Sequence, residues 1–312
     1  MTAFTWDNFL QLTVNGWVHG TAYALLGVAF GLILGVTGRF HFAFTFTYAI
    51  SAYLAATAST DWGIPFWPSL IIGAAFGAAC GMVMEAFVYR PLALRAGAYA
   101  LLTIFVASLG LAIIGTNSIA LYWINEASLQ ISGFDNRGIN IGPVTLATLD
   151  RDFMIVTWAL IFLLAAVLRF TALGRVIRAV RVNPEMSLVI GVNPLSIYLV
   201  VFAIGGFLGG VAAVFDATKT AATPDMGFNP LFYAFTVAFL SGLSLRPLLV
   251  LAIGLGLGLI ESWANLVLAP QWTQLVVFGI LFVYVALRPV HLQALLNKVL
   301  APVRHRQRAM AG

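Results

Sequence analysis

Apolar and polar positions follow one another along this chain in long blocks. Nearly uninterrupted apolar runs cover residues 69–87, 153–168, 194–215 and 247–260. A helix of about 20 residues crosses the hydrocarbon core of a bilayer, whereas the strands of a membrane barrel are only ~10 residues long and alternate apolar with polar positions. The blocks therefore predict membrane-spanning helices. We expect spans at residues 14–36, 40–58, 66–88, 98–123, 152–168, 195–215, 229–245, 247–268 and 271–287, of which the second and the seventh are short.

Composition supports this interpretation. Hydrophobic residues make up 61% of the 312 residues, charged residues make up 9%, and the mean hydropathy is +0.98. A soluble domain is typically about a quarter charged. We therefore expect an all-α polytopic membrane protein with about 8–9 transmembrane helices, some of them short or discontinuous. Residues 1–290 would form one transmembrane domain and residues 291–312 a basic tail. Cys80 is the single cysteine, so neither a disulfide within the chain nor a thiolate metal site is expected.

The basic residues indicate the orientation of the spans. Thirteen of the 16 lysines and arginines lie on one set of ends and loops, and the other three are Arg137, Arg151 and Lys219. The positive-inside rule places the richer set in the cytoplasm. The loop 169–194 and the C-terminal tail are then cytoplasmic, and the loop 124–152 is external. Glycines and a proline break any helix in that external loop, so we expect a small hairpin or lid there.

The second span contains "FHFAFTFTYAISAY" (residues 40–53), whose large and small residues alternate as in a strand. An unpaired strand in lipid would leave its backbone groups without hydrogen bonds, so the segment should be helical. One face of that helix carries both polar and aromatic groups. This face would either pack against other helices, with its hydroxyls bonded back to its own backbone, or form a wall of the substrate pathway. The candidate pathway residues are His41, Phe44, Thr45, Thr47, Tyr48 and Ser51.

The seventh span supplies a second candidate wall. Phe228, Phe232, Phe235 and Phe239 form a stripe at helical spacing, and polar side chains lie beside it. Such a stripe is more often a packing surface than a ligand site, and both interpretations stay open. The candidate pathway residues of this span are Asn229, Phe232, Tyr233, Phe235 and Thr236.

Three further groups of polar residues are notable. Glu261 lies within the eighth span, where a carboxylate is costly and either has a functional role or is bonded to a neighbour. Glu85, near the cytoplasmic end of the third span, is expected to pair with a loop arginine. Asp216, Lys219 and Asp225 are expected in a solvated external loop, with the docking of a binding protein as the alternative.

The loop 169–194 contains signals for a separate short helix. Arg169, Arg175, Arg178 and Arg181 fit a helix at the membrane surface. Asn183 suits a helix N-cap, Pro184 the first helical position, Glu185 the first turn, and Gly191 a left-handed end. The sequence therefore predicts a two-turn helix over residues 184–190. A helix this short needs packing partners, either its own membrane domain or another protein.

In these features the chain resembles the permease subunits of ABC importers of the branched-chain amino acid type, from about Leu10 to Gln293. The first span, "NGWVHGTAYALLGVAFGLILGVTG", the boundary "EAFVYRPL" and the end "LRPVHL" are similar to that family. The most specific match is the loop pattern formed by Arg169, Gly174, Arg175, Arg178, Ala179, Gly191 and Asn193.

The resemblance implies that the short helix is a coupling helix seated in a cytoplasmic ATPase subunit. The implied coupling residues are Gly174, Arg175, Arg178, Asn183, Pro184, Glu185, Met186 and Gly191. It also implies a second homologous permease, two ATP-binding subunits and an extracytoplasmic solute-binding protein, all at a bacterial inner membrane. The chain itself is not expected to be an enzyme, because neither of its lysines follows a Walker A loop. ATP and magnesium would bind to the partner ATPases, and neither a metal nor a nucleic acid is expected on this chain.

The chain departs from the family where the second span begins. The family usually has Asn, His, Gly and Glu where this chain has His41, Phe44, Thr45 and Phe46. The resemblance implies a small carboxylate-bearing solute such as a branched-chain amino acid. If the altered segment lines the pathway, the change predicts a more apolar or aromatic relative, although drift in a packing helix would give the same change. The alternative function is a secondary transporter or channel that works without ATPases.

Overall fold

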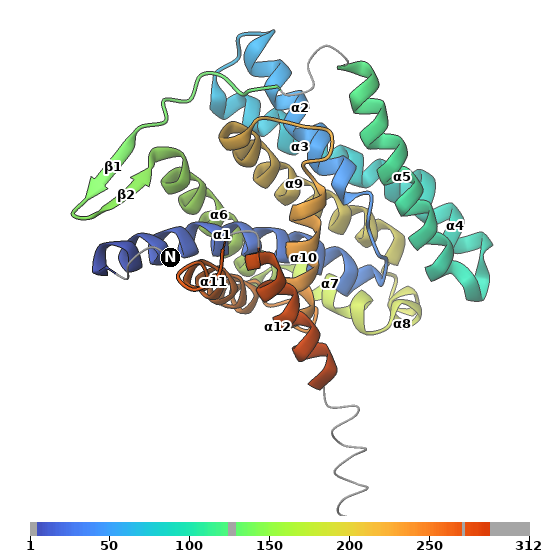
Figure 1. Cartoon of the computed structure of the whole chain (residues 1–312). Helices are drawn as coiled ribbons and strands as arrows, with labels where there is room; N and C mark the ends of the chain where they lie inside the picture. The colour runs from blue at the N-terminus through green and yellow to red at the C-terminus, as the bar shows by residue number, and fades with distance from the viewer. Residues whose placement is uncertain (1–4, 124–128, 270–271, 288–312) are drawn as a thin grey trace, which may run out of the picture.

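The computed structural model describes residues 5–123, 129–269 and 272–287, and the predicted tail 291–312 lies outside them. Almost all of the described chain is helical (Figure 1). A π-helical turn (Glu85–Tyr89) follows α3, a 3-10 turn (Gly97–Tyr99) precedes α5, and the strands β1 (Gly138–Ile141) and β2 (Val144–Ala147) pair antiparallel. The α-helices are α1 (Trp6–Thr37), α2 (Phe44–Thr60), α3 (Phe66–Met84), α4 (Arg90–Arg95), α5 (Ala100–Tyr122), α6 (Thr148–Phe170), α7 (Ala172–Val182), α8 (Pro184–Val189), α9 (Pro194–Thr220), α10 (Phe228–Leu240), α11 (Pro247–Ala264) and α12 (Thr273–Leu287).

The prediction of an all-α polytopic membrane protein is confirmed. Among the residues that the structure describes, six helical segments are long and apolar enough to cross a membrane: α1, α3 continued through α4, α5, α6, α9 and α11. The helices α2 and α10, which correspond to the spans expected to be short, have 17 and 13 residues. The alternating segment that begins at Phe40 is helical from Phe44 onward, as the lipid argument requires, while His41 lies in the turn before the helix.

Two boundaries differ from the expected ones in ways that matter for function. The helix α9 continues past residue 215 to Thr220, so Asp216 and Lys219 lie on a helix and not in a solvated loop. The short helix α8 ends at Val189, one residue before the expected end. The hairpin expected in the loop 124–152 is present as β1 and β2, and residues 124–128 lie outside the described ranges.

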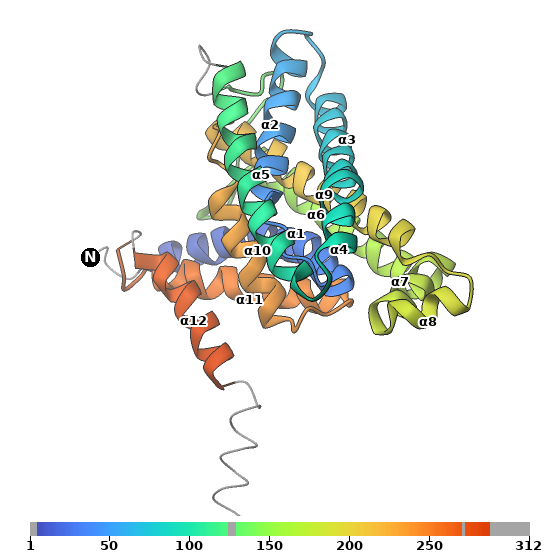
Figure 2. The same cartoon turned by 90° about the vertical axis from the view of Figure 1, so that its right-hand side faces the viewer.

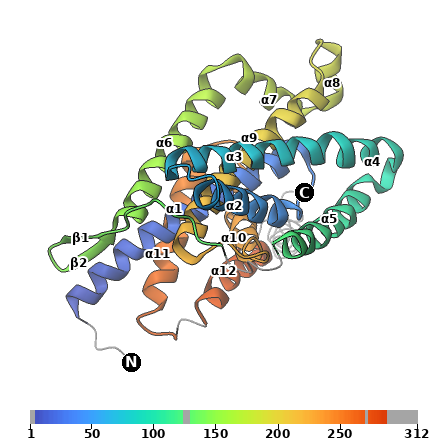
Figure 3. The ribbon, with the colours of Figure 1, turned by 90° about the horizontal axis from the view of Figure 1, so that it is seen from above.

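The bundle has two distinct ends. The β-hairpin, the start of α6 and the end of α9 lie at one end, which we call the hairpin end, and α7 with α8 lies at the opposite end, which we call the α7–α8 end (Figures 1 and 3). The helix α1 is buried along most of its length and contacts α6, α9, α10 and α11. Seen from the side, α7 and α8 project beyond the helices that surround α1 (Figure 2).

Glycines allow the central helices to approach closely. A Cβ atom at Gly20 of α1 would lie 2.6 Å from the Cα of Leu255 in α11, and one at Gly77 of α3 would lie 2.6 Å from the carbonyl oxygen of Gly206 in α9. Real Cβ atoms do not occupy such positions, so larger residues would push these pairs of helices apart. Small residues at helix contacts are how membrane bundles gain van der Waals packing, since lipid supplies no hydrophobic driving force between helices.

We expect the Gly258→Ala substitution to destabilise the protein by roughly 1–3 kcal/mol, the usual cost of overpacking. A methyl group at Gly258 would overlap the backbone of Gly20, whereas a methyl group at Gly256, on the same helix, meets nothing within 4 Å. Gly256→Ala is therefore the matched control, with a change within about 0.5 kcal/mol. Unfolding of the detergent-solubilised protein by SDS titration measures both, and equal stability of the two variants would contradict the packing described.

Candidate functional site

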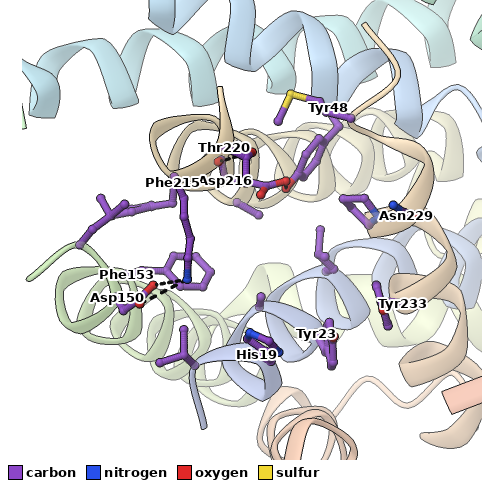
Figure 4. A pocket seen from close by; sticks show the side chains of 18 of the residues that line it. His19, Tyr23, Tyr48, Asp150, Phe153, Phe215, Asp216, Thr220, Asn229 and Tyr233 are labelled. Carbon is purple, nitrogen blue, oxygen red and sulfur yellow. Dashed lines mark hydrogen bonds and ion pairs between the residues drawn. The ribbon is translucent and has the colours of Figure 1, made fainter. Parts of the chain in front are cut away.

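A cavity of about 450 Å³ opens between α1, α2, α6, α9 and α10 near the hairpin end (Figure 4). Its wall combines aliphatic, aromatic and charged side chains, which is the composition expected of a site for a small polar molecule with an apolar body. The lining residues are Val18, His19, Ala22, Tyr23, Leu26, Tyr48, Leu149, Asp150, Phe153, Ala212, Phe215, Asp216, Lys219, Thr220, Thr223, Met226, Asn229, Pro230 and Tyr233.

Two carboxylates and one ammonium group define the charged side of the cavity. Asp216 of α9 accepts a hydrogen bond from the hydroxyl of Tyr48 at 3.1 Å. One turn later on the same helix, the Nζ atom of Lys219 lies 3.0 and 3.3 Å from the two carboxylate oxygens of Asp150, at the start of α6. The first contact joins α9 to α2 and the second joins it to α6, so the charged side chains also hold three walls of the cavity together.

A stacked pair of tyrosines forms the opposite side. The rings of Tyr23 on α1 and Tyr233 on α10 lie 4.1 Å apart with an interplanar angle of 13°. The hydroxyl of Tyr233 donates to Oε1 of Glu261 on α11 at 3.3 Å. Of the two alternatives considered for this intramembrane carboxylate, a functional role or a bond to a neighbour, the structure shows a bonded neighbour on another helix. Glu261 lies behind the cavity wall and fixes the position of a residue that lines it.

Three of the eleven predicted pathway residues line this cavity: Tyr48, Asn229 and Tyr233. The hydroxyls of Thr45, Thr47 and Ser51 each bond back to a carbonyl of their own segment, at 3.1, 3.1 and 2.7 Å. The other five predicted residues are not among the described lining residues of the cavity either. His41, Phe44 and Thr236 are fully buried. Phe232 and Phe235 contact other phenylalanine rings. These eight side chains lie in helix contacts in this structure, and their part in transport stays a prediction.

The sequence interpretation missed most of the charged and aromatic wall. His19 and Tyr23 are four positions apart, so they share one face of α1. Asp216 and Lys219 are three positions apart and share one face of α9. That spacing was a usable local signal. Nothing local, however, shows that these two faces and the start of α6 meet around one cavity.

A buried ion pair lies at the other end of the bundle. Arg39, in the turn after α1, pairs with Glu85, the first residue of the π-helical turn, and their side chains are 6% and 0% exposed. The expected pairing of Glu85 with a loop arginine is therefore confirmed. The guanidinium also lies 4.9 Å from the ring centre of Tyr198, and His41 shares a hydrogen bond of 2.8 Å with Tyr89 of the same π-helical turn.

The α7–α8 end has the local geometry that its sequence predicts. The side chain of Asn183 caps α8 by accepting from the backbone nitrogen of Met186 at 3.0 Å, and Gly191 follows the helix with φ = 80°. A Cβ atom at Gly174 would collide with the carbonyl of Leu168, and Arg178 donates to that same carbonyl. Gly174 and Arg178 therefore set the sharp turn from α6 into α7. Arg175, Pro184 and Glu185 are exposed on this end.

The surface of α8 is unusually apolar for an exposed helix. Met186 is 61% exposed and Val189 is 80% exposed, and Leu188 and Ile190 are similarly accessible. Ser187 is the one residue of α8 that is buried, and its hydroxyl bonds to the carbonyl of Asn183 at 2.9 Å. The side of α8 that carries Ser187 thus packs against the rest of the protein, while the apolar side chains of α8 are exposed.

We expect Arg39→Met to destabilise the protein by about 3–5 kcal/mol, because it leaves the Glu85 carboxylate buried without its cation. The double variant Arg39→Met/Glu85→Met should recover most of that loss, since no lone charge remains. Arg137→Met, which removes an exposed ion pair with Asp135, is the control, with a cost of at most about 1 kcal/mol. SDS titration measures all three, and a double variant as unstable as Arg39→Met would refute this account.

Comparison with known proteins places the chain among transport permeases. The BraD permease protein of a high-affinity branched-chain amino acid transport system from Pseudomonas aeruginosa is 29% identical, over 90% of this chain and 94% of that protein. The corresponding LivH protein of Salmonella typhimurium is 26% identical over the same shares. A fructose import permease protein, FrcC of Rhizobium meliloti, is 26% identical over 92% of this chain and 78% of its own length. No solved structure matches at a significant level.

The family described as the branched-chain amino acid transport system / permease component matches residues 12–286, which include every residue that lines the cavity and both α7 and α8. The expected resemblance is thereby confirmed. The chain belongs to the family of branched-chain amino acid transport system permease components, and it is a multi-pass membrane protein of that family.

Proposed function

We propose that this chain is the transmembrane subunit of an ABC importer that moves a small carboxylate-bearing solute into the cytoplasm across a bacterial inner membrane. The solute is a branched-chain amino acid or a more apolar or aromatic relative, and ATP is hydrolysed by separate subunits. The observation that supports this most is the arrangement of the two ends: a solute-sized cavity at one, an exposed apolar helix at the other, and α9 running between them.

The distribution of charge supports the orientation of this importer. At the α7–α8 end lie Arg39, the arginines of α4, those of α7, and Arg246, whereas the hairpin end has Arg137, Arg151 and Lys219. By the positive-inside rule the α7–α8 end faces the cytoplasm, and so does the C-terminus. The cavity then opens toward the outside, where a solute would arrive.

The α7–α8 end supports the docking of an ATPase. The apolar side chains of Met186, Leu188 and Val189 on α8, and of Ile190 directly after it, are exposed at the end of the bundle opposite the hairpin (Figure 3). An exposed apolar patch of this kind marks an interaction site. The turn set by Gly174 and Arg178 links α8 firmly to α6, and Asn193 starts α9 directly after it. A displacement of α8 would therefore reach α6 and α9, both of which line the cavity.

The remaining partners follow from the family. We propose a second homologous permease, a pair of ATP-binding subunits and an extracytoplasmic solute-binding protein at the hairpin end. Exposed leucines, isoleucines and valines along α5, such as Leu102, Val106 and Ile113, support contact with lipid or with the second permease. In this arrangement the chain has no catalytic residue of its own, and its work is to bind, enclose and release the solute.

Reconstitution decides between this proposal and a transporter or channel that works without ATPases. The purified chain alone in liposomes should give no concentrative uptake of leucine. Uptake should appear when the second permease, the ATPase subunits and a binding protein of the same system are added. Uptake by the chain alone, with no association of ATPase subunits on co-purification, would falsify the proposal. Glu261 would then be the first residue to test for ion coupling, since it is the buried carboxylate of the external half.

We expect Met186→Asp to abolish the association of ATPase subunits, because it places a charge in the middle of the exposed apolar surface of α8. Met186→Leu is the matched control and should retain association, since it keeps an apolar side chain of similar volume. Co-purification measures the association, with a loss of at least about tenfold expected for the loss of one buried apolar contact and the burial of a charge. The thermal midpoint of the chain alone should be unchanged, because the side chain is exposed; full association of Met186→Asp would contradict the docking surface.

A further inference from the structure

We propose that Asp216 binds the ammonium group of an α-amino acid and that Lys219 binds its carboxylate, so that this cavity selects amino acids over plain carboxylates and over uncharged solutes. The inference rests on the proposed transport function and names the chemical class of its solute. The proposal favours an amino acid over the more apolar or aromatic carboxylates that the sequence analysis left open as solutes. It also favours an amino acid over a sugar, such as the fructose in the name of one relative.

The charge balance of the cavity is the first argument. Apart from tyrosines, the ionisable residues that line it are His19, Asp150, Asp216 and Lys219. Lys219 and Asp150 neutralise one another through contacts at 3.0 and 3.3 Å. Within the described part of the chain no ion pair includes Asp216. With a neutral His19, the cavity carries one net negative charge, and its unpaired carboxylate, Asp216, favours a cationic group of the solute beside it.

The geometry of Asp216 supports the same role. Its Oδ2 atom accepts from the hydroxyl of Tyr48 at 3.1 Å, which fixes the carboxylate at the cavity wall. A carboxylate accepts about four hydrogen bonds, so most of its capacity is left for a donor inside the cavity. Figure 4 shows the Asp216 and Tyr48 side chains meeting above the space that His19, Tyr23 and Tyr233 bound from below. An ammonium group there would also face aromatic rings, which attract cations.

The position of Lys219 supplies the second half of the site. It lies three positions after Asp216, so the two side chains are neighbours on one face of α9, with Cβ atoms roughly 5–6 Å apart. An ammonium group has three donors, and the contacts with Asp150 leave Lys219 able to donate to a solute carboxylate. The opposite charges of an α-amino acid are carried on neighbouring atoms, so one molecule can reach both side chains. A plain carboxylate would satisfy Lys219 and leave Asp216 without a cation.

The rest of the wall suits an apolar side chain. Val18, Ala22, Leu26 and Phe153 line the cavity beside the charged side. These residues come from α1 and α6, across the cavity from α9, so a solute held at Asp216 and Lys219 by its charged end directs its side chain toward them. Polar recognition at one end and apolar contact at the other is the usual design of a small-molecule site.

The experiment uses the importer complex, with its ATPase subunits, in nanodiscs, and calorimetry of three probes. The probes are leucine, 4-methylpentanoate, which lacks the amino group, and 3-methylbutylamine, which lacks the carboxylate. We expect leucine to bind at least about tenfold more tightly than 4-methylpentanoate, because only leucine pairs with Asp216. Equal affinities for leucine and 4-methylpentanoate in the wild-type complex would overturn the proposal.

The variants separate recognition from structure. Asp216→Asn should weaken leucine at least about tenfold and leave 4-methylpentanoate unchanged, while Asp216→Glu should retain part of the preference for leucine. Tyr48→Phe should weaken leucine less than Asp216→Asn does, because the carboxylate remains; equal losses would mean that Asp216 only holds Tyr48 in place, and would overturn the proposal. The control is Asp225→Asn, an exposed carboxylate that does not line the cavity.

Refutation of the ammonium site can be distinguished from refutation of the proposed transport function. Co-purification of the ATPase subunits tests that function independently of any solute. If the ATPases associate but leucine binds equally well to the wild type and to Asp216→Asn, the transport function stands and the ammonium site is refuted. If no ATPase associates but leucine binding to the chain alone in nanodiscs depends on Asp216, the ammonium site stands and the ABC assignment is refuted.

Discussion

The close approach of two helix pairs is the constraint on which the rest of this structure depends. The helices α1 and α11 meet through Gly16, Gly20 and Gly258, and α3 and α9 meet through Gly77 and Gly206. In lipid the apolar surface of a helix gains nothing from burial against another apolar surface, so the stability of such contacts comes from van der Waals packing at short range. These two pairs fix α1 and α9 in the centre of the bundle, and every other wall of the cavity is positioned against one of them.

The polar side chains of the cavity are consistent with this arrangement. Tyr48, Asp150 and Lys219 join α2 and α6 to α9, and the stack of Tyr23 on Tyr233 joins α1 to α10. The cavity is thus bounded by α1 and α9, which glycine contacts hold in place, and by the helices that hydrogen bonds and stacked rings join to them. A wall of this kind moves as whole helices. The connection from α8 through the turn at Gly174 into α6, and directly into α9, gives such a movement a route from the opposite end.

The features that the sequence predicted correctly are local ones. The short helix after Asn183 and its end near Gly191 depend on capping groups within a few residues of each other, and the spans depend on the length of apolar runs. The cavity depends on which faces of five helices meet, and no residue in α1 or α9 encodes that locally. The polar face of the second span shows the difference. Its helical form was predicted from the lipid environment. Of its six candidate residues, however, Tyr48 is the one that lines the cavity, the hydroxyls of Thr45, Thr47 and Ser51 bond to nearby backbone carbonyls, and the rings of His41 and Phe44 pack against other helices.

The ion pair of Arg39 and Glu85 has a consequence for how sequences of this kind can change over time. Either side chain left alone would be a buried charge without a counterion, whereas an uncharged pair of similar volume would be tolerated. The two positions are 46 residues apart, yet neutralising either one alone leaves the other charge buried without its partner. Replacement of both charges together, or a gain of stability elsewhere, offsets that cost. The turn after α1 and the π-helical turn after α3 are therefore inherited as one unit.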